Sequence, residues 1–132
     1  MPTAPDPAGP DPAFPYLGER DRFRFPDPLR VREPGIGASG GNLSPGMLLS
    51  AYEQGYFPWY SEDDPLLWWS PDPRFVLFPE KLHVSASMRK VLRRGEFDIR
   101  FDSAFPEVIR ACSQIERPGQ DGTWIVDDMI AA

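Results

Sequence analysis

Cysteine and histidine are almost missing from this sequence, which has one of each, Cys112 and His83. A single cysteine cannot form a disulfide within the chain, and one cysteine with one histidine cannot supply the ligands of a tetrahedral zinc site. We therefore expect neither a disulfide framework nor a metal site. A reducing cytoplasm is the simplest setting for such a chain.

Long apolar runs and an excess of basic residues are also missing. No stretch approaches the ~18 consecutive apolar residues of a membrane span, and the first residues lack the basic and apolar regions of a signal peptide. The net charge of −6 and the pI near 4.7 argue against a surface that binds nucleic acid throughout. We expect a soluble, cytoplasmic protein in which any site for a polyanion is local.

The composition is otherwise that of a folded protein, because 41% of the 132 residues are hydrophobic and 13% are aromatic. The first fifteen residues hold six of the seventeen prolines. Such a segment is typical of an extended, mobile tail, which we place at residues 1–22. We expect ordered structure to begin around residues 23–28.

A helix is well signalled after a glycine-rich stretch. We interpret residues 35–41, GIGASGG, as a tight loop rather than a phosphate-binding loop, because no lysine follows at the required position. Ser44 suits the N-cap, Pro45 the first helical position, and Gly55 the end. The spacing predicts one buried face, made by Met47, Leu48, Ala51 and Tyr52.

Six aromatic residues follow within residues 56–69: Tyr56, Phe57, Trp59, Tyr60, Trp68 and Trp69. Large rings bury much apolar area, so a hydrophobic core explains them. Exposed rings can also stack on nucleobases, so a binding platform is the alternative. Composition alone favours the core.

The second half alternates expected strands and helices. Residues 74–79 and 96–102 have the patterns of short strands, and residues 81–94 and a segment after Ser103 have helical spacing. A last helix is expected to begin at Asp127 or Asp128. We interpret Cys112 and His83 as structural rather than catalytic, since no partner base is evident.

The helix predicted over residues 81–94 carries five Lys or Arg residues and no acidic residue. Its apolar face is opposite Arg89, Lys90, Arg93 and Arg94. A solvated helix face explains such a pattern in most proteins. In a chain of net charge −6, a phosphate backbone is the alternative partner.

The composition and spacing alone support an α+β protein with a basic helix and an aromatic cluster. They show no paired base and nucleophile, no metal cluster and no glycine fingerprint. The sequence stops one turn into the last predicted helix, so we expect it to be the front part of a longer protein.

Several motifs resemble one family, the leucyl/phenylalanyl-tRNA–protein transferases. They are GGNLSP, AYEQGYFPW, WWSPDPR and GTWI, in that order, with Phe25-Pro26 before them. The resemblance covers residues 23–132. It implies a small N-terminal α+β domain, residues 23–73, followed by the first and incomplete part of an acetyltransferase-like domain, residues 74–132.

The resemblance also implies an activity. The family transfers Leu, Phe or Met from aminoacyl-tRNA to the N-terminal Arg or Lys of proteins, which marks them for degradation. The partners implied are aminoacyl-tRNA and such protein substrates, with a monomeric full-length enzyme. No cofactor is implied, because the aminoacyl ester is already activated.

Site residues follow from the motifs that match. The resemblance implies that Trp59 and Trp124 line the pocket for the terminal adenosine and the aminoacyl group, while Trp68 and Trp69 join the two domains. It places tRNA contacts at Arg89, Lys90, Arg93 and Arg94. The family's proton-accepting groups lie beyond Ala132, so no catalytic residue is assigned here and this chain alone is expected to be inactive.

Two other hypotheses remain open. A truncated module would bind tRNA or a partner without catalysis, and a purely structural fragment would have an inert basic helix. Reading the coding DNA past Ala132 distinguishes them, because an open frame supports the transferase and a stop codon supports the alternatives.

Overall fold

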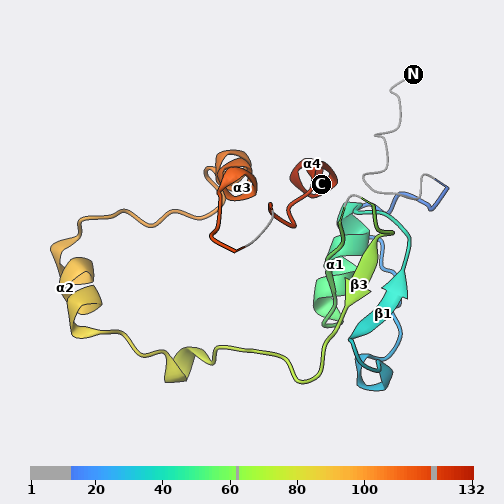
Figure 1. Ribbon diagram of the computed structural model, residues 1–132, viewed down its shortest axis with the longest axis horizontal. Helices are drawn as coiled ribbons and strands as arrows, with labels where there is room; N and C mark the ends of the chain where they lie inside the picture. The colour runs from blue at the N-terminus through green and yellow to red at the C-terminus, as the bar shows by residue number, and fades with distance from the viewer. Residues whose placement is uncertain (1–12, 62, 120–121) are drawn as a thin grey trace.

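The computed structural model describes residues 13–61, 63–119 and 122–132, and its elements confirm the predicted α+β class. A three-stranded antiparallel sheet has the order β1-β3-β2 and lies beside α1 (Figure 1). Trp69 on β3 is paired with Ile36 on one side and Phe57 on the other. The elements are η1 Pro28–Arg30, β1 Ile36–Ser39, α1 Pro45–Glu53, β2 Phe57–Pro58, β3 Leu67–Trp69, η2 Pro79–Lys81, α2 Ala86–Arg94, α3 Phe105–Gln114 and α4 Asp127–Ala131.

Trp68 is at the centre of the core. Its side chain is fully buried, its ring centroid lies 5.1 Å from that of Phe25, and its indole N–H donates to the carbonyl of Gly40 at 3.0 Å. Phe25 and Gly40 lie within residues 23–73, whereas Val126 and Met129 of the second part pack against the core cluster that contains Trp68. That Trp68 and Trp69 join two domains stays a prediction. The other buried hydrophobic residues are Phe25, Leu43, Met47, Ala51, Tyr56, Tyr60 and Leu66.

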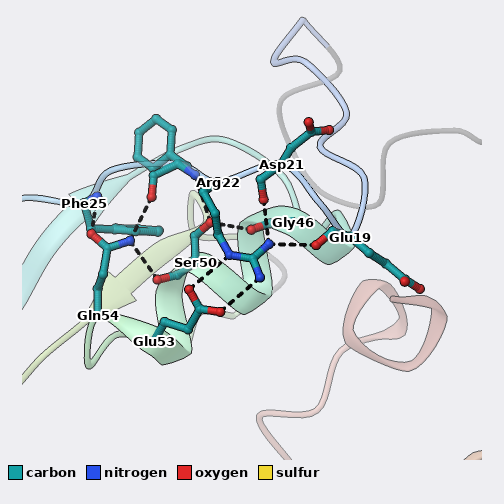
Figure 2. Close-up of polar contacts among 9 residues, drawn as sticks. Glu19, Asp21, Arg22, Phe25, Gly46, Ser50, Glu53 and Gln54 are labelled. Carbon is teal, nitrogen blue, oxygen red and sulfur yellow. Dashed lines mark hydrogen bonds and ion pairs between the residues drawn. The ribbon is translucent and has the colours of Figure 1, made fainter.

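The expectation of a mobile tail over residues 1–22 is wrong for its last part. The backbone N–H groups of Leu17 and Phe23 donate to the hydroxyls of Ser44 and Ser50. Arg22 makes a two-point contact with Glu53 at 3.0 Å (Figure 2). These side-chain acceptors hold the segment against α1. Residues 1–12 lie outside the described part of the chain.

Gln54 completes this arrangement at the end of α1. Its amide accepts from the N–H of Phe25 at 3.0 Å and donates to the carbonyl of Phe23 at 2.8 Å. Gly46 permits the close approach, because a Cβ there would collide with the carbonyl of Gly18. The segment is therefore fastened to the helix in two ways: its backbone groups form hydrogen bonds with side chains of Ser44, Ser50 and Gln54, and its apolar residues Leu17, Phe23 and Phe25 pack in or against the core.

Helix α1 follows the prediction, with two differences. Ser44 is the N-cap residue and Pro45 opens the helix, yet the Ser44 hydroxyl accepts from Leu17 instead of capping. Met47 and Ala51 are buried as expected, whereas Tyr52 is 61% exposed. The predicted tight loop at residues 35–41 is wrong as well, because Ile36–Ser39 form β1.

The two strands predicted at residues 74–79 and 96–102 are absent from the described structure. Residues 74–78 and 96–102 have no regular secondary structure, Pro79 opens η2, and the alternating side chains Phe97, Ile99 and Phe101 are exposed. A strand is defined by hydrogen bonds to a neighbour, and neither segment has one here. Ala104, not Ser103, is the N-cap residue of α3.

The chain after β3 leaves the core and returns to it. Residues 74–104, with η2 and α2, form a wide arc, and α3 and α4 then lie near α1 (Figure 1). Val126 and Met129, beside and within α4, pack against the core cluster. As predicted, α4 begins at Asp127.

Candidate binding site

Trp59 follows β2 and presents a half-exposed ring. Its side chain is 48% exposed, while its backbone is held at both ends: the N–H donates to the carbonyl of Leu67 at 3.0 Å, and its carbonyl accepts from the indole of Trp69 at 2.7 Å. The Trp59 and Trp69 rings lie 5.3 Å apart and tilted by 47°. Such a ring has a fixed position and a free face, which suits stacking on a planar ligand.

A small hollow of about 190 Å³ lies beside this ring. Asp64 and Ser61 give it a polar edge, and the Asp64 carboxylate accepts from the N–H of Ser61 at 3.4 Å. The lining residues are Trp59, Tyr60, Ser61, Asp64, Leu67 and Trp69.

Trp124 is also half-exposed, at 47%, and lines a different cavity of about 440 Å³. This cavity lies between α1 and β2 on one side and α3 and α4 on the other. Its walls are almost entirely apolar, which suits an uncharged side chain more than a nucleobase or a phosphate. They are formed by Leu43, Leu48, Tyr52, Phe57, Pro58, Phe105, Ile109, Trp124, Ile125, Met129 and Ala132.

The two tryptophans assigned to one pocket from the sequence therefore line two neighbouring hollows. Pro58 borders the larger one and the next residue, Trp59, borders the smaller one. Leu48 and Tyr52, which the spacing predicts to face the core, line the larger cavity, and Leu48 also packs against the core cluster. The sequence contains part of the signal for this cavity. Leu48 and Tyr52 lie on one face of α1, and the apolar residues Phe57 and Pro58 follow soon after the helix.

The basic residues of α2 are all exposed. Arg94 pairs with Glu96 at 3.1 Å, whereas Arg89, Lys90 and Arg93 have no acidic partner among the residues that the structure describes. Arg89 and Arg93 flank a shallow hollow of about 580 Å³ with Leu92 between them. Three unneutralised cations on one short helix form a local positive patch in an acidic chain.

Tyr60 is the buried neighbour of Trp59. Its side chain is 6% exposed, and its hydroxyl lacks a hydrogen-bond partner within the described residues. Burial, and to a smaller extent the nearby carboxylate of Asp128, together raise the pKa of Tyr60 to about 12. The phenol is therefore neutral at physiological pH.

We expect this tyrosine to make stability fall at high pH. The unfolded state releases the phenol proton near pH 10, but the folded state keeps it to about pH 12. The free energy of unfolding should thus decrease across that window as pH rises, and Tyr60→Phe should flatten the decrease. Urea unfolding of both proteins between pH 9 and 12 measures it. Equal slopes for the two proteins would show that Tyr60 does not cause the loss.

The single cysteine and the single histidine do not form a reactive site with each other. Cys112 is partly buried in α3 and His83 is exposed after η2. In the described ranges, no cluster of three His, Cys, Asp or Glu residues could hold a metal ion. Among the same residues, no helix has the length and apolar character needed to cross a membrane.

Two family models match this chain. The model for the leucyl/phenylalanyl-tRNA protein transferase N-terminal domain matches residues 41–72, and the model for leucyl/phenylalanyl-tRNA protein transferase matches residues 76–132. The first contains Trp59, and the second contains α2 and Trp124. Together they cover about two thirds of the chain.

Curated relatives agree with these matches. The chain is 57% identical over 108 residues to the leucyl/phenylalanyl-tRNA–protein transferase of Myxococcus xanthus, which is 82% of this chain and 46% of the relative. It is 50% identical over 124 residues to that of Chromobacterium violaceum, covering 94% of this chain and 49% of the relative. The chain thus spans about half the length of the curated relatives it matches. By both comparisons, it belongs to the leucyl/phenylalanyl-tRNA–protein transferase family.

Proposed function

We propose that the full-length protein transfers Leu, Phe or Met from aminoacyl-tRNA to the N-terminal Arg or Lys of proteins, and thereby marks them for degradation in the cytoplasm. The observation that carries the proposal is the half-exposed Trp59, held rigidly within a motif of the family's N-terminal domain. The relatives' names supply the reaction class.

The residues of this chain have a binding role in the proposal. Trp59 stacks on the terminal adenosine of the tRNA, and Trp124 borders the apolar cavity that accepts the uncharged aminoacyl side chain. The patch on α2 contacts the tRNA backbone through Arg89, Lys90 and Arg93, with Arg94 shared with Glu96. Residues 74–132 are the first part of the acetyltransferase-like domain in this proposal.

The chemistry is an aminolysis. The neutral α-amine of the protein substrate attacks the ester carbonyl of aminoacyl-tRNA, an amide bond forms, and the ester C–O bond breaks. The ribose hydroxyl of the tRNA leaves with the proton that the amine gives up. Because the ester is already activated, catalysis depends on positioning the two reactants, and Trp59 contributes by fixing the adenosine.

The test is Trp59→Ala in the full-length enzyme. Loss of one stacking surface of ~1–3 kcal/mol should raise the KM for aminoacyl-tRNA by roughly 5–150-fold, while the melting temperature changes little because the ring is half-exposed. Steady-state kinetics with charged tRNA and thermal melting measure both. A large drop in melting temperature with an unchanged KM would reject the stacking role.

A further inference from the structure

Arg74 follows β3 and has no role in the proposed function. Its guanidinium carbon lies 4.9 Å from the centroid of the Phe57 ring, and one of its N–H groups donates to the carbonyl of Gly55 at 3.0 Å. Gly55 lies in the turn between α1 and β2, and Phe57 opens β2. The side chain is exposed to solvent, yet two contacts fix its charged end at the start of this strand.

The two contacts leave the guanidinium able to bind an anion. A hydrogen bond to a neutral carbonyl and an aromatic ring do not neutralise its charge, and its other N–H groups have no acceptor among the residues that the structure describes. It has no acidic partner in that part of the chain either. A guanidinium held in this way is suited to a phosphate group, whose oxygens accept two parallel hydrogen bonds from arginine.

Arg74 lies on the same side of the sheet as the half-exposed Trp59. The ring of Trp69 lies 5.3 Å from that of Trp59, and Trp69 is paired directly with Phe57 in the register of β2 and β3. Side chains that are directly paired, or two residues apart in a strand, project from the same face, so Phe57, Trp59 and Trp69 share one face. Phe57 and Trp59 are ~6.6 Å apart along it. Because Arg74 contacts the Phe57 ring, its guanidinium lies on this face next to the stacking ring.

The spacing matches that within a nucleotide. In the proposed function the terminal adenosine stacks on Trp59, and a phosphate is separated from its base by one ribose, a distance similar to that between neighbouring positions on one face of a strand. The group within reach of Arg74 is therefore the phosphodiester on the 5′ side of that adenosine. The cations of α2 lie on the wide arc away from the sheet (Figure 1), and Arg74 therefore adds a contact that they do not make.

We propose that Arg74 binds the phosphodiester that joins the terminal adenosine of the aminoacyl-tRNA to the preceding nucleotide. Its N–H groups donate to the phosphate oxygens, while its contacts with Gly55 and Phe57 hold it in place. Binding at this phosphate and stacking on Trp59 fix the adenosine at two points, which orients the aminoacyl ester. The inference rests on the proposed function and adds a phosphate subsite to it.

Two small ligands test the subsite in the full-length protein. One is 3′-leucylamino-3′-deoxyadenosine, a stable amide analogue of the charged terminal adenosine that has no phosphate. The other is the same nucleoside with a cytidylate joined to its 5′ oxygen, which adds a single phosphodiester. Arg74→Ala should weaken binding of the second ligand at least ~10-fold and binding of the first less than ~2-fold, because a hydrogen-bonded charge pair is lost only in the second. Isothermal titration calorimetry measures both dissociation constants.

Matched variants separate this role from a structural one. Arg74→Met keeps an unbranched apolar stem over Phe57 and should show the same selective loss, whereas Arg30→Ala removes a charge from η1 and should leave both affinities unchanged. Trp59→Ala should weaken both ligands by a similar factor. A selective effect of Arg74→Ala with no effect of Trp59→Ala would reject the stacking role and keep the phosphate subsite. Equal weakening of both ligands by Arg74→Ala, as a structural role at the α1–β2 turn requires, or no weakening of either, would overturn the proposal.

Discussion

Replacing Trp68 by alanine should lower the free energy of unfolding by about 3–5 kcal/mol, the range of buried aromatic truncations. The ring is fully buried against Phe25, and its indole satisfies the carbonyl of Gly40 at 3.0 Å. Truncation leaves a cavity and an unpaired carbonyl together. The corresponding decrease in melting temperature is at least ~12 °C.

Trp59→Ala is the matched control, because it removes the same side chain from a neighbouring strand end where the ring is half-exposed. Urea unfolding of both variants gives the comparison. If the two substitutions cost the same free energy, the division of the aromatic residues into a buried core and an exposed binding ring is wrong.

Removing two cations from α2 should weaken tRNA binding of the full-length protein by on the order of 100-fold at 50 mM salt, if each contacts one phosphate. The logarithm of the affinity falls with the logarithm of the salt concentration by ~0.7–0.9 per phosphate contact. The estimate applies this slope between 50 mM and 1 M salt, with equal affinities of variant and wild type at 1 M. The variant is Arg89→Ala with Arg93→Ala, because both residues lack an acidic partner among the described residues. The salt slope itself should decrease by ~1.4–1.8.

Arg30→Ala with Arg110→Ala is the control, since it removes the same charge from η1 and α3. Binding of charged tRNA across a range of salt concentrations distinguishes the variants. The basic face of α2 is only a solvated surface if both double variants give the same affinity and slope.

Local signals predicted the helices well. A cap residue, a proline at the first position and apolar spacing placed α1, and local spacing placed the start of α4. The helix predicted over residues 81–94 begins only at Ala86, after the separate turn η2. A helix forms its hydrogen bonds within one segment, so the information that determines it is close in sequence. The motifs were equally informative about the family. A motif is matched by its residue types and their order along the chain, so the match does not depend on how the chain packs.

The sequence by itself thus determined the α+β class, the helices and the family. Only the tertiary structure decided that Trp68 is buried and Trp59 half-exposed, that Leu17–Phe23 lie on α1, and that residues 96–102 remain unpaired. These features depend on partners distant in sequence: Gly40 for Trp68, Ser44 and Ser50 for the N-terminal segment, and a neighbouring strand for residues 96–102. An alternating pattern indicates which side of a strand can be buried. The hydrogen bonds that make the segment a strand need a second segment, whose position the pattern does not specify.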